Sequence, residues 1–302
     1  MKKAMVLPLH KKKKLGDIMK LAVVANNVNN ILEYEKIGAD AFIFGLKNYS
    51  SGYRNNLTID EIKDLRKKYN GELFIAINKN IFNKELEELE KIMITLDEIK
   101  INGILFYDLA ILSIRNRLKL SVPLVWNQTH MVTNYNTCNY YYDKGCEFCV
   151  LASEITLDEI KEIKSKTKMH LFMNVLGYQI MGYSRRHLLD NYFKSTGKQR
   201  VKDSYVIKNK DEDYIIDEEE NGNAIYYGKP LNGSNVVLNT DVDYLILNDN
   251  IFEKDIFSKS LELFKKLIDT KDEKYIDDID KLVGDNRGFF FKKTIYKVKK
   301  DD

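Results

Sequence analysis

Cysteine is scarce in this sequence: the 302 residues include three, Cys138, Cys146 and Cys149. So few thiols in a long chain indicate a reducing compartment and no disulfide framework. No apolar run approaches the roughly 18 residues of a membrane-spanning helix. The opening stretch, MKKAMVLPLHKKKKLG, is positively charged, but its apolar run is too short for a secretory signal. We therefore expect a cytoplasmic protein with no membrane partner.

Several motifs that identify enzyme classes are missing. No G-x-G-x-x-G follows the first apolar segment, which argues against a dinucleotide-binding sheet. The absence of H-E-x-x-H excludes a zincin, and the absence of G-x-S-x-G excludes the serine of an α/β-hydrolase. Ser184, His187 and Asp190 are spaced by three and would share one face of a predicted helix. One helix face seldom aims a base at a nucleophile beside an oxyanion hole, so we predict no catalytic triad.

The cysteines themselves do not predict a metal site. Cys146 and Cys149 have the C-x2-C spacing that suits zinc when it lies on a turn. Here the pair lies in or just before an apolar strand, where residues three apart point to opposite faces. The sequence also has no second C-x2-C pair. We interpret all three cysteines as core thiols and predict no metal ligands.

Charge is unevenly distributed, although the net charge is only +3. Residues 182–210 are rich in lysine and arginine, whereas residues 211–220 are mostly acidic. Tyr183 and Tyr192 are interleaved with the basic residues. Basic and aromatic side chains together suit the phosphates and bases of RNA, although a solvated helix would also carry such charges. The residues predicted to bind RNA are Arg185, Lys194, Lys198 and Arg200.

Short apolar strands alternate with helices from residue 20 onward. The predicted strands are KLAVVANN, AFIFG, LFIAIN, GILFYD, PLVWN, FCVLA, HLFMNV and DYLILND. Thr58 and Glu61 have the spacing of a capping box at the start of one intervening helix. Eight such units over roughly 250 residues predict a TIM-like (β/α)8 barrel of the α/β class. An open doubly wound sheet is the alternative.

The chain departs from this alternation in three places. Residues 1–19 precede it and are expected to form a disordered basic arm, so that residues 20–302 form a single barrel domain. An insertion at about 178–242, between strands seven and eight, contains β-rich runs around Asn221-Gly222, a strong hairpin signal. The tail at about 284–302 has an alternating pattern and predicts a late strand or hairpin that packs on the body.

Polar residues follow most of the predicted strands. In a barrel these positions gather at the C-terminal face, where functional groups lie. Amides predominate, and titratable groups are few. Each residue taken singly could reflect only the polarity of loops, but the set favours a pocket for a polar small molecule or a nucleotide. Members of this set include Asn78, Asn127, Thr129 and Glu154.

Four stretches together resemble peptidase family U32, the collagenase-like peptidases. They are GADAFIFGLKNYSSGYRNNLT, WNQTHMVTNYNTCNYYYDKGCEFCVLASEITLDEI, FMNVLGYQIMGYSRRHLLDNYF and NRGFFFKKTIYKV. The resemblance covers about residues 20–300 and is nearest to short members without a metal cluster, which are linked to tRNA wobble-uridine hydroxylation. It implies a TIM-like barrel and either peptidase activity or the hydroxylation of RNA bases.

The sequence departs from that family pattern at the positions that would bind an iron–sulfur cluster. Ile180 and His187 stand where the resemblance places the first two cluster cysteines, and Leu176 replaces a histidine before Gly177. Because no cysteine follows Cys149, a four-cysteine cluster is excluded. The arginines that match the family pattern are Arg54 and Arg186, and they remain compatible with an anionic small-molecule ligand.

We therefore predict a tRNA-modifying protein that acts in wobble 5-hydroxyuridine formation and has tRNA as its partner. A peptidase is the first alternative; the second is a non-catalytic RNA-binding scaffold for a cluster-bearing paralogue of the same family. The predicted catalytic residues are Glu154, Arg54 and Arg186. The predicted ligand-binding residues are Asn56, Asn78, Asn127, Thr129, Asn134, Ser184 and Asn191.

Overall fold

A computed structural model describes residues 19–128, 130–210 and 212–292. Thr129, most of the predicted basic arm and residues 293–302 of the predicted tail lie outside the described residues. Residues 284–292 of the tail form turns and irregular backbone without a strand. No helix in the described ranges is both long and apolar enough to cross a membrane.

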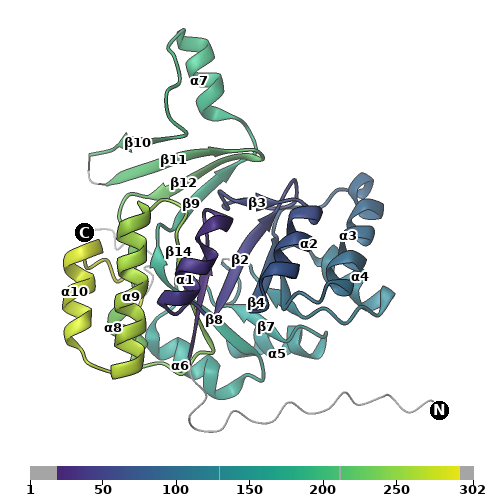
Figure 1. Cartoon of the computed structure of the whole chain (residues 1–302), viewed down its shortest axis with the longest axis horizontal. Coiled ribbons are helices and arrows are strands. Elements are labelled where there is room, and N and C mark those ends of the chain that lie inside the picture. Colours follow the sequence, from purple (N-terminus) through teal and green to yellow (C-terminus); the bar gives the residue numbers. More distant parts are fainter. Residues whose placement is uncertain (1–18, 129, 211, 293–302) are drawn as a thin grey trace, which may run out of the picture.

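Eight parallel strands close into a barrel, which confirms the predicted fold class (Figure 1). The order around the barrel is β1-β14-β8-β7-β6-β5-β4-β2, and β2 pairs with β1 to complete the ring. The barrel strands are β1 (Lys20–Val24), β2 (Ala41–Leu46), β4 (Glu72–Ile77), β5 (Gly103–Phe106), β6 (Leu124–Trp126), β7 (Phe148–Val150), β8 (His170–Gly177) and β14 (Tyr244–Asn248). Each coincides with one of the eight predicted apolar runs.

Helices lie on the outside of the barrel, between its strands or after the last of them (Figure 1). They are α1 (Ile31–Ile37), α2 (Ile59–Lys68), α3 (Leu86–Glu98), α4 (Leu109–Leu118), α5 (Tyr135–Asp143), α6 (Leu157–Lys166), α8 (Ser234–Val237), α9 (Lys254–Thr270) and α10 (Lys274–Val283). The predicted capping box is present: Thr58 Oγ1 accepts from the Glu61 N–H at 3.2 Å, and the Glu61 carboxylate accepts from the Thr58 N–H at 2.8 Å. This satisfies donors that a helix start otherwise leaves unpaired.

The barrel interior is filled unevenly along its axis. Phe74, Phe148, Phe172 and Tyr244 pack edge to face or stacked near the N-terminal ends of their strands. Smaller side chains such as Val150 line the C-terminal half. The bulky aromatic rings therefore close the N-terminal end, and the C-terminal end is where a ligand can enter, as in other barrels of this kind.

A second, antiparallel sheet is inserted between β8 and β14 and stands over the barrel (Figure 1). Its order is β10-β11-β12-β9, and helix α7 (Leu188–Thr196) projects from it between β9 and β10. The short strand β13 (Leu231–Asn232) then returns to pair with β8. The inserted strands are β9 (Ile180–Ser184), β10 (Ser204–Lys208), β11 (Asp213–Glu219) and β12 (Gly222–Tyr227).

The predicted helix that carries Ser184, His187 and Asp190 is wrong in its first part. Ser184 ends strand β9, His187 precedes α7, and Asp190 lies within that helix, so the three do not share a helix face. Pairing with β12 decides the conformation here, because Tyr183 is opposite Ala224 and Ser184 opposite Asn223. Local helical spacing is overridden by this tertiary contact.

The predicted hairpin is present, but its turn lies one residue earlier than the Asn-Gly signal implied. Glu219 pairs with Gly222, so Glu220 and Asn221 form the turn and Gly222 begins β12. A Cβ at Gly222 would lie 2.0 Å from the Ser184 carbonyl oxygen, and its φ is +137°. Glycine is required at this position because β9 approaches so closely.

Candidate functional site

A cavity of about 350 Å³ lies at the C-terminal mouth of the barrel, beneath the inserted sheet. Its floor includes the residues that follow β4, β5 and β6, and its roof is strand β9. We call it the mouth cavity. Its lining residues are Ser51, Gly52, Asn78, Lys79, Asn80, Tyr107, Asn127, His130, Ile180, Met181, Gly182, Tyr183, Arg185 and Asn221.

Hydrogen bonds fix the roof to the barrel. The Tyr183 hydroxyl donates to the Asn221 carbonyl oxygen at 2.5 Å, and the Asn221 side chain donates to the Ser50 carbonyl oxygen at 2.8 Å. Below them, Asn78 exchanges two 2.9 Å hydrogen bonds with the backbone of Ser51. The predicted ligand residue Asn78 thus lines the cavity but uses its amide to hold the loop after β2.

Asn127 and Asn80 differ from Asn78 in this respect. Both line the mouth cavity, and neither side chain has a hydrogen-bond partner among the described residues. Each amide can therefore offer a donor and an acceptor to a ligand. Asn127 is a predicted ligand residue, and it lies in the lining of the mouth cavity.

His130 connects the mouth cavity to the predicted catalytic residue Glu154. His130 Nδ1 lies 3.7 Å from Glu154 Oε1, and both side chains are more than half exposed. Glu154 therefore lies beside a residue of the cavity lining rather than in the lining itself. Such a pair can exchange a proton with a ligand held at the mouth.

The two neighbouring arginines after β9 have different surroundings. Arg185 lines the mouth cavity, and its guanidinium carbon lies 4.8 Å from the centre of the Phe82 ring. Arg186 is exposed, its N–H donates to Ser184 Oγ at 3.2 Å, and it is not part of the cavity lining. Of the pair, the structure thus places Arg185 at the mouth, although the family resemblance pointed to Arg186.

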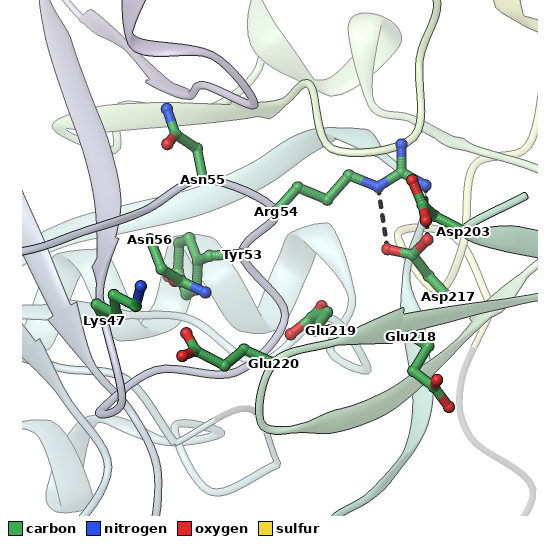
Figure 2. Close-up of a pocket in the computed structure, with 10 residues that line it drawn as sticks. All are labelled: Lys47, Tyr53, Arg54, Asn55, Asn56, Asp203, Asp217, Glu218, Glu219 and Glu220. Carbon is green, nitrogen blue, oxygen red and sulfur yellow. Dashed lines mark hydrogen bonds and ion pairs between the residues drawn. The ribbon is translucent and has the colours of Figure 1, made fainter. Parts of the chain in front are cut away.

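Arg54 lies in a second cavity of about 340 Å³, between the loop after β2 and the inserted sheet (Figure 2). Its guanidinium contacts Asp217 of β11 through two hydrogen bonds, Nε to Oδ2 at 3.0 Å and Nη2 to Oδ1 at 2.6 Å. Asp217 is only 2% exposed. Arg54 is therefore committed to a buried ion pair that joins the barrel to the insert. The other lining residues are Lys47, Tyr53, Asn55, Asn56, Asp203, Glu218, Glu219 and Glu220.

Glu219 of the second cavity is a largely buried carboxyl group with another carboxylate, Asp217, nearby. One carboxylate oxygen accepts from the Gly52 N–H at 2.8 Å. Burial, reinforced by the neighbouring Asp217, raises the pKa of Glu219 to about 7, although the Gly52 hydrogen bond opposes this shift. A carboxyl group with this pKa changes its charge near neutral pH.

The sequence profile of peptidase family U32 matches residues 26–287, which is most of the barrel and all of the insert. The chain belongs to peptidase family U32.

Two curated relatives in Bacillus subtilis (strain 168) show which members of this family the chain is similar to. tRNA hydroxylation protein P2 is 27% identical, and the alignment covers 91% of this chain and 98% of that protein. tRNA hydroxylation protein P1 is 25% identical, and the alignment covers 60% of this chain but only 44% of that longer protein. A solved U32 peptidase is 12% identical, with a TM-score of 0.49 over 79% of this chain and 96% of that chain.

An ion-pair network surrounds His187, the position where the family resemblance places a cluster cysteine. The side chains of His187 and Asp190 both lie close to Glu218 of β11. Arg200 Nη1 lies 2.5 Å from both Asp190 Oδ1 and Glu218 Oε1, so a guanidinium occupies the position between the two carboxylates. Arg200 was predicted to bind RNA, but its charge is used within the insert.

Other residues predicted for the U32 site have local structural contacts. Asn134 Oδ1 accepts from the Thr137 N–H at 2.9 Å and caps α5. Asn56 Oδ1 lies 2.5 Å from Ser50 Oγ, within the loop after β2. Asn191 and Lys194 are on the projecting helix α7, and Lys198 follows it; all three are exposed or partly exposed.

Sequence reasoning missed the roof of the mouth cavity. The missed roof residues are Ile180, Met181, Gly182 and Tyr183 of β9, a strand that the helical spacing of the segment concealed. A signal existed in YQIMGY, where apolar and aromatic residues surround a glycine, as expected for a strand with a close neighbour. Tyr107, in contrast, is near the end of the predicted strand GILFYD, and Asn80 comes two residues after LFIAIN, so both could have been added from position alone.

Proposed function

We propose that this U32 protein acts in tRNA modification, in the formation of 5-hydroxyuridine at the wobble position, with the mouth cavity as its site. One observation carries the proposal. The cavity lies at the C-terminal end of the barrel and is lined by amides, tyrosines and cations, in a chain that aligns almost end to end with a protein named for tRNA hydroxylation. Amide, aromatic and cationic groups are those that recognise the edges, faces and phosphates of single-stranded RNA.

Within this proposal the roles follow from the contacts. Asn127 and Asn80 supply hydrogen bonds to the substrate, and Arg185 binds a phosphate or another anionic group. His130, beside Glu154, exchanges protons at the mouth. Arg54 acts indirectly, because it holds the inserted sheet in place over the barrel.

The chain would not hold a four-cysteine iron–sulfur cluster as part of this function. It has three cysteines, and all are fully buried in the core, with Cys138 Sγ 3.8 Å from Cys149 Sγ. A four-cysteine site needs four thiolates that face one cluster. Any cluster chemistry would come from a paralogous U32 subunit.

The same buried thiols weigh against the peptidase alternative, since no cysteine is open to a peptide bond. Gelatin cleavage by the purified protein that is lost in Glu154→Gln would nevertheless favour it. Salt-sensitive tRNA binding without turnover would favour the scaffold alternative.

Deletion of the gene, followed by mass spectrometry of tRNA nucleosides, tests the proposal. We expect the 5-hydroxyuridine derivatives to fall and to return when the gene is restored. An unchanged nucleoside profile in the deletion strain would reject a role in this modification.

A further inference from the structure

The mouth cavity and the second cavity differ in charge, although they are similar in volume. The second cavity has five carboxylate residues in its lining, Asp203, Asp217, Glu218, Glu219 and Glu220. The mouth cavity has none among the described residues that line it, and it includes Lys79 and Arg185. An RNA strand carries one negative charge per phosphate, so of the two cavities only the mouth is electrostatically compatible with it.

The size of the mouth cavity limits what can enter. Its volume of about 350 Å³ is near the lower end of the range for small-molecule sites, roughly 300–1,000 Å³. Strand β9 covers it as a roof and is fixed by the Tyr183–Asn221–Ser50 hydrogen bonds. A recess of this kind takes one nucleotide that has left its stack, rather than a base-paired helix.

The lining matches the chemistry of a single base. Tyr107 and Tyr183 offer rings, and Met181 of the roof is 61% exposed. Asn127 offers a donor and an acceptor side by side, the complement of the acceptor and donor on the edge of a uracil ring. Lys79 is already paired with Glu85, with Nζ 2.7 Å from Oε1, which leaves Arg185 as the better phosphate partner of the two.

We propose that the mouth cavity binds one flipped-out pyrimidine base of an RNA loop, with Asn127 on the base edge, Tyr107 and Tyr183 against the ring, and Arg185 on an adjoining phosphate. The proposal rests on the proposed function, because it takes RNA as the substrate. It goes further by assigning the base-reading residues and by excluding the acidic second cavity from RNA contact.

Gly182 provides a steric test of this base pocket. It lies in the roof, and a Cβ added there would meet no atom within 4 Å. Its φ is outside the left-handed range, so a larger residue is not strained at this position. Gly182→Leu therefore adds bulk to the roof of the cavity and removes no side-chain hydrogen bond, whereas Asn127→Ala removes the base-edge contact without adding bulk.

The experiment uses the full chain and two anticodon stem–loop RNAs, one with uridine and one with an abasic site at the wobble position. We expect wild-type protein to bind the uridine RNA about tenfold more tightly, the size of effect that one recognised base supplies. Gly182→Leu and Asn127→Ala should reduce the ratio of the two affinities, uridine RNA over abasic RNA, to near one. Their circular dichroism spectra should match that of the wild-type protein. Asn239→Ala, an exposed amide before β14 at the opposite end of the barrel, is the matched control and should keep the ratio.

Equal affinity of the wild-type protein for the two RNAs would overturn the base pocket. A preference for the uridine RNA that both cavity variants keep would overturn it as well. Displacement of the RNA by a collagen-derived peptide but not by uridine monophosphate would assign the cavity to a peptide instead. Failure of the base pocket leaves the proposed function standing if gene deletion still lowers 5-hydroxyuridine. An unchanged nucleoside profile together with a uridine preference would reject the function and keep the pocket.

Photo-crosslinking locates the base directly. An anticodon stem–loop with 5-iodouridine at the wobble position should crosslink to Tyr107, Tyr183 or Met181, as mapped by mass spectrometry. Crosslinks confined to the second cavity or to helix α7 would contradict the assignment.

Discussion

Arg54 of the loop after β2 and Asp217 of strand β11 form a two-point ion pair between the barrel and the inserted sheet. Asn250, after β14, reinforces this contact: its Nδ2 donates to the Gly52 carbonyl oxygen at 2.6 Å, and its Oδ1 accepts from the Arg54 N–H at 3.3 Å. The roof of the mouth cavity belongs to the same inserted sheet. The position of the roof therefore depends on the Arg54–Asp217 pair, which does not touch the cavity.

The first prediction concerns this pair. Arg54→Ala leaves the Asp217 carboxylate buried without its counterion, which should cost about 3 kcal/mol in the free energy of unfolding. Hydrogen exchange should accelerate in β9, β11 and β12 more than in the barrel strands. Arg54→Ala/Asp217→Asn should recover part of the loss, because the buried charge is removed. Uniform acceleration over the whole chain would contradict a local role for the pair.

The second prediction follows from the carboxyl group of Glu219. Its pKa is about 7 in the folded protein, above the ordinary value of 4.5. The folded state thus binds the proton more tightly, so wild-type stability should fall as the pH rises from about 4.5 to 7. Glu219→Gln removes this titration and should gain up to about 3 kcal/mol over wild type between pH 5 and pH 8.

Urea unfolding at several pH values measures the difference between the two proteins. Asp249, whose pKa burial also raises to about 7, is present in both and cancels in the comparison. Parallel pH profiles for wild type and Glu219→Gln would show that Glu219 is not the group that titrates.

The third prediction separates the two kinds of cation in the insert. Lys194 and Lys198 have no ion pair among the described residues, whereas Arg200 contacts both Asp190 and Glu218. Lys194→Ala/Lys198→Ala should weaken tRNA binding and lower its salt dependence with little change in melting temperature. Arg200→Ala should mainly lower the melting temperature. The opposite assignment of the two effects would refute this division.

The fourth prediction concerns Arg185. Its loss should weaken binding of RNA loops of any sequence and reduce the slope of log affinity against log salt by about one. Arg117→Ala is the control, because Arg117 is an exposed arginine of α4 that pairs with Glu90. Equal slopes for Arg185→Ala and wild type would remove Arg185 from phosphate binding.

The sequence predicted the barrel well because its strands and helices are local patterns. Each buried strand is a short apolar run, and a capping box such as Thr58–Glu61 depends on residues three apart. The same holds for the positions of Asn78 and Asn127, which follow from the rule that loops after barrel strands meet at one face.

The parts that the sequence did not reveal depend on contacts between distant residues. Arg54 is 163 positions from Asp217, and Asn221 is 171 positions from Ser50. No spacing rule links such pairs, so the ion pair of Arg54 and the roof over the mouth required a structure. Arg185 and Arg186 are adjacent in the sequence, and only the course of the chain after β9 distinguishes them.

The most direct test of the account is the amount of 5-hydroxyuridine derivatives in tRNA from a deletion strain that expresses wild-type protein, Asn127→Ala or Asn239→Ala at equal levels. We predict full recovery with wild type and Asn239→Ala, and at least about tenfold less with Asn127→Ala, since the base-edge contact is lost. Full recovery with Asn127→Ala, or no recovery with wild type, would contradict the claim that the mouth of this barrel serves tRNA hydroxylation.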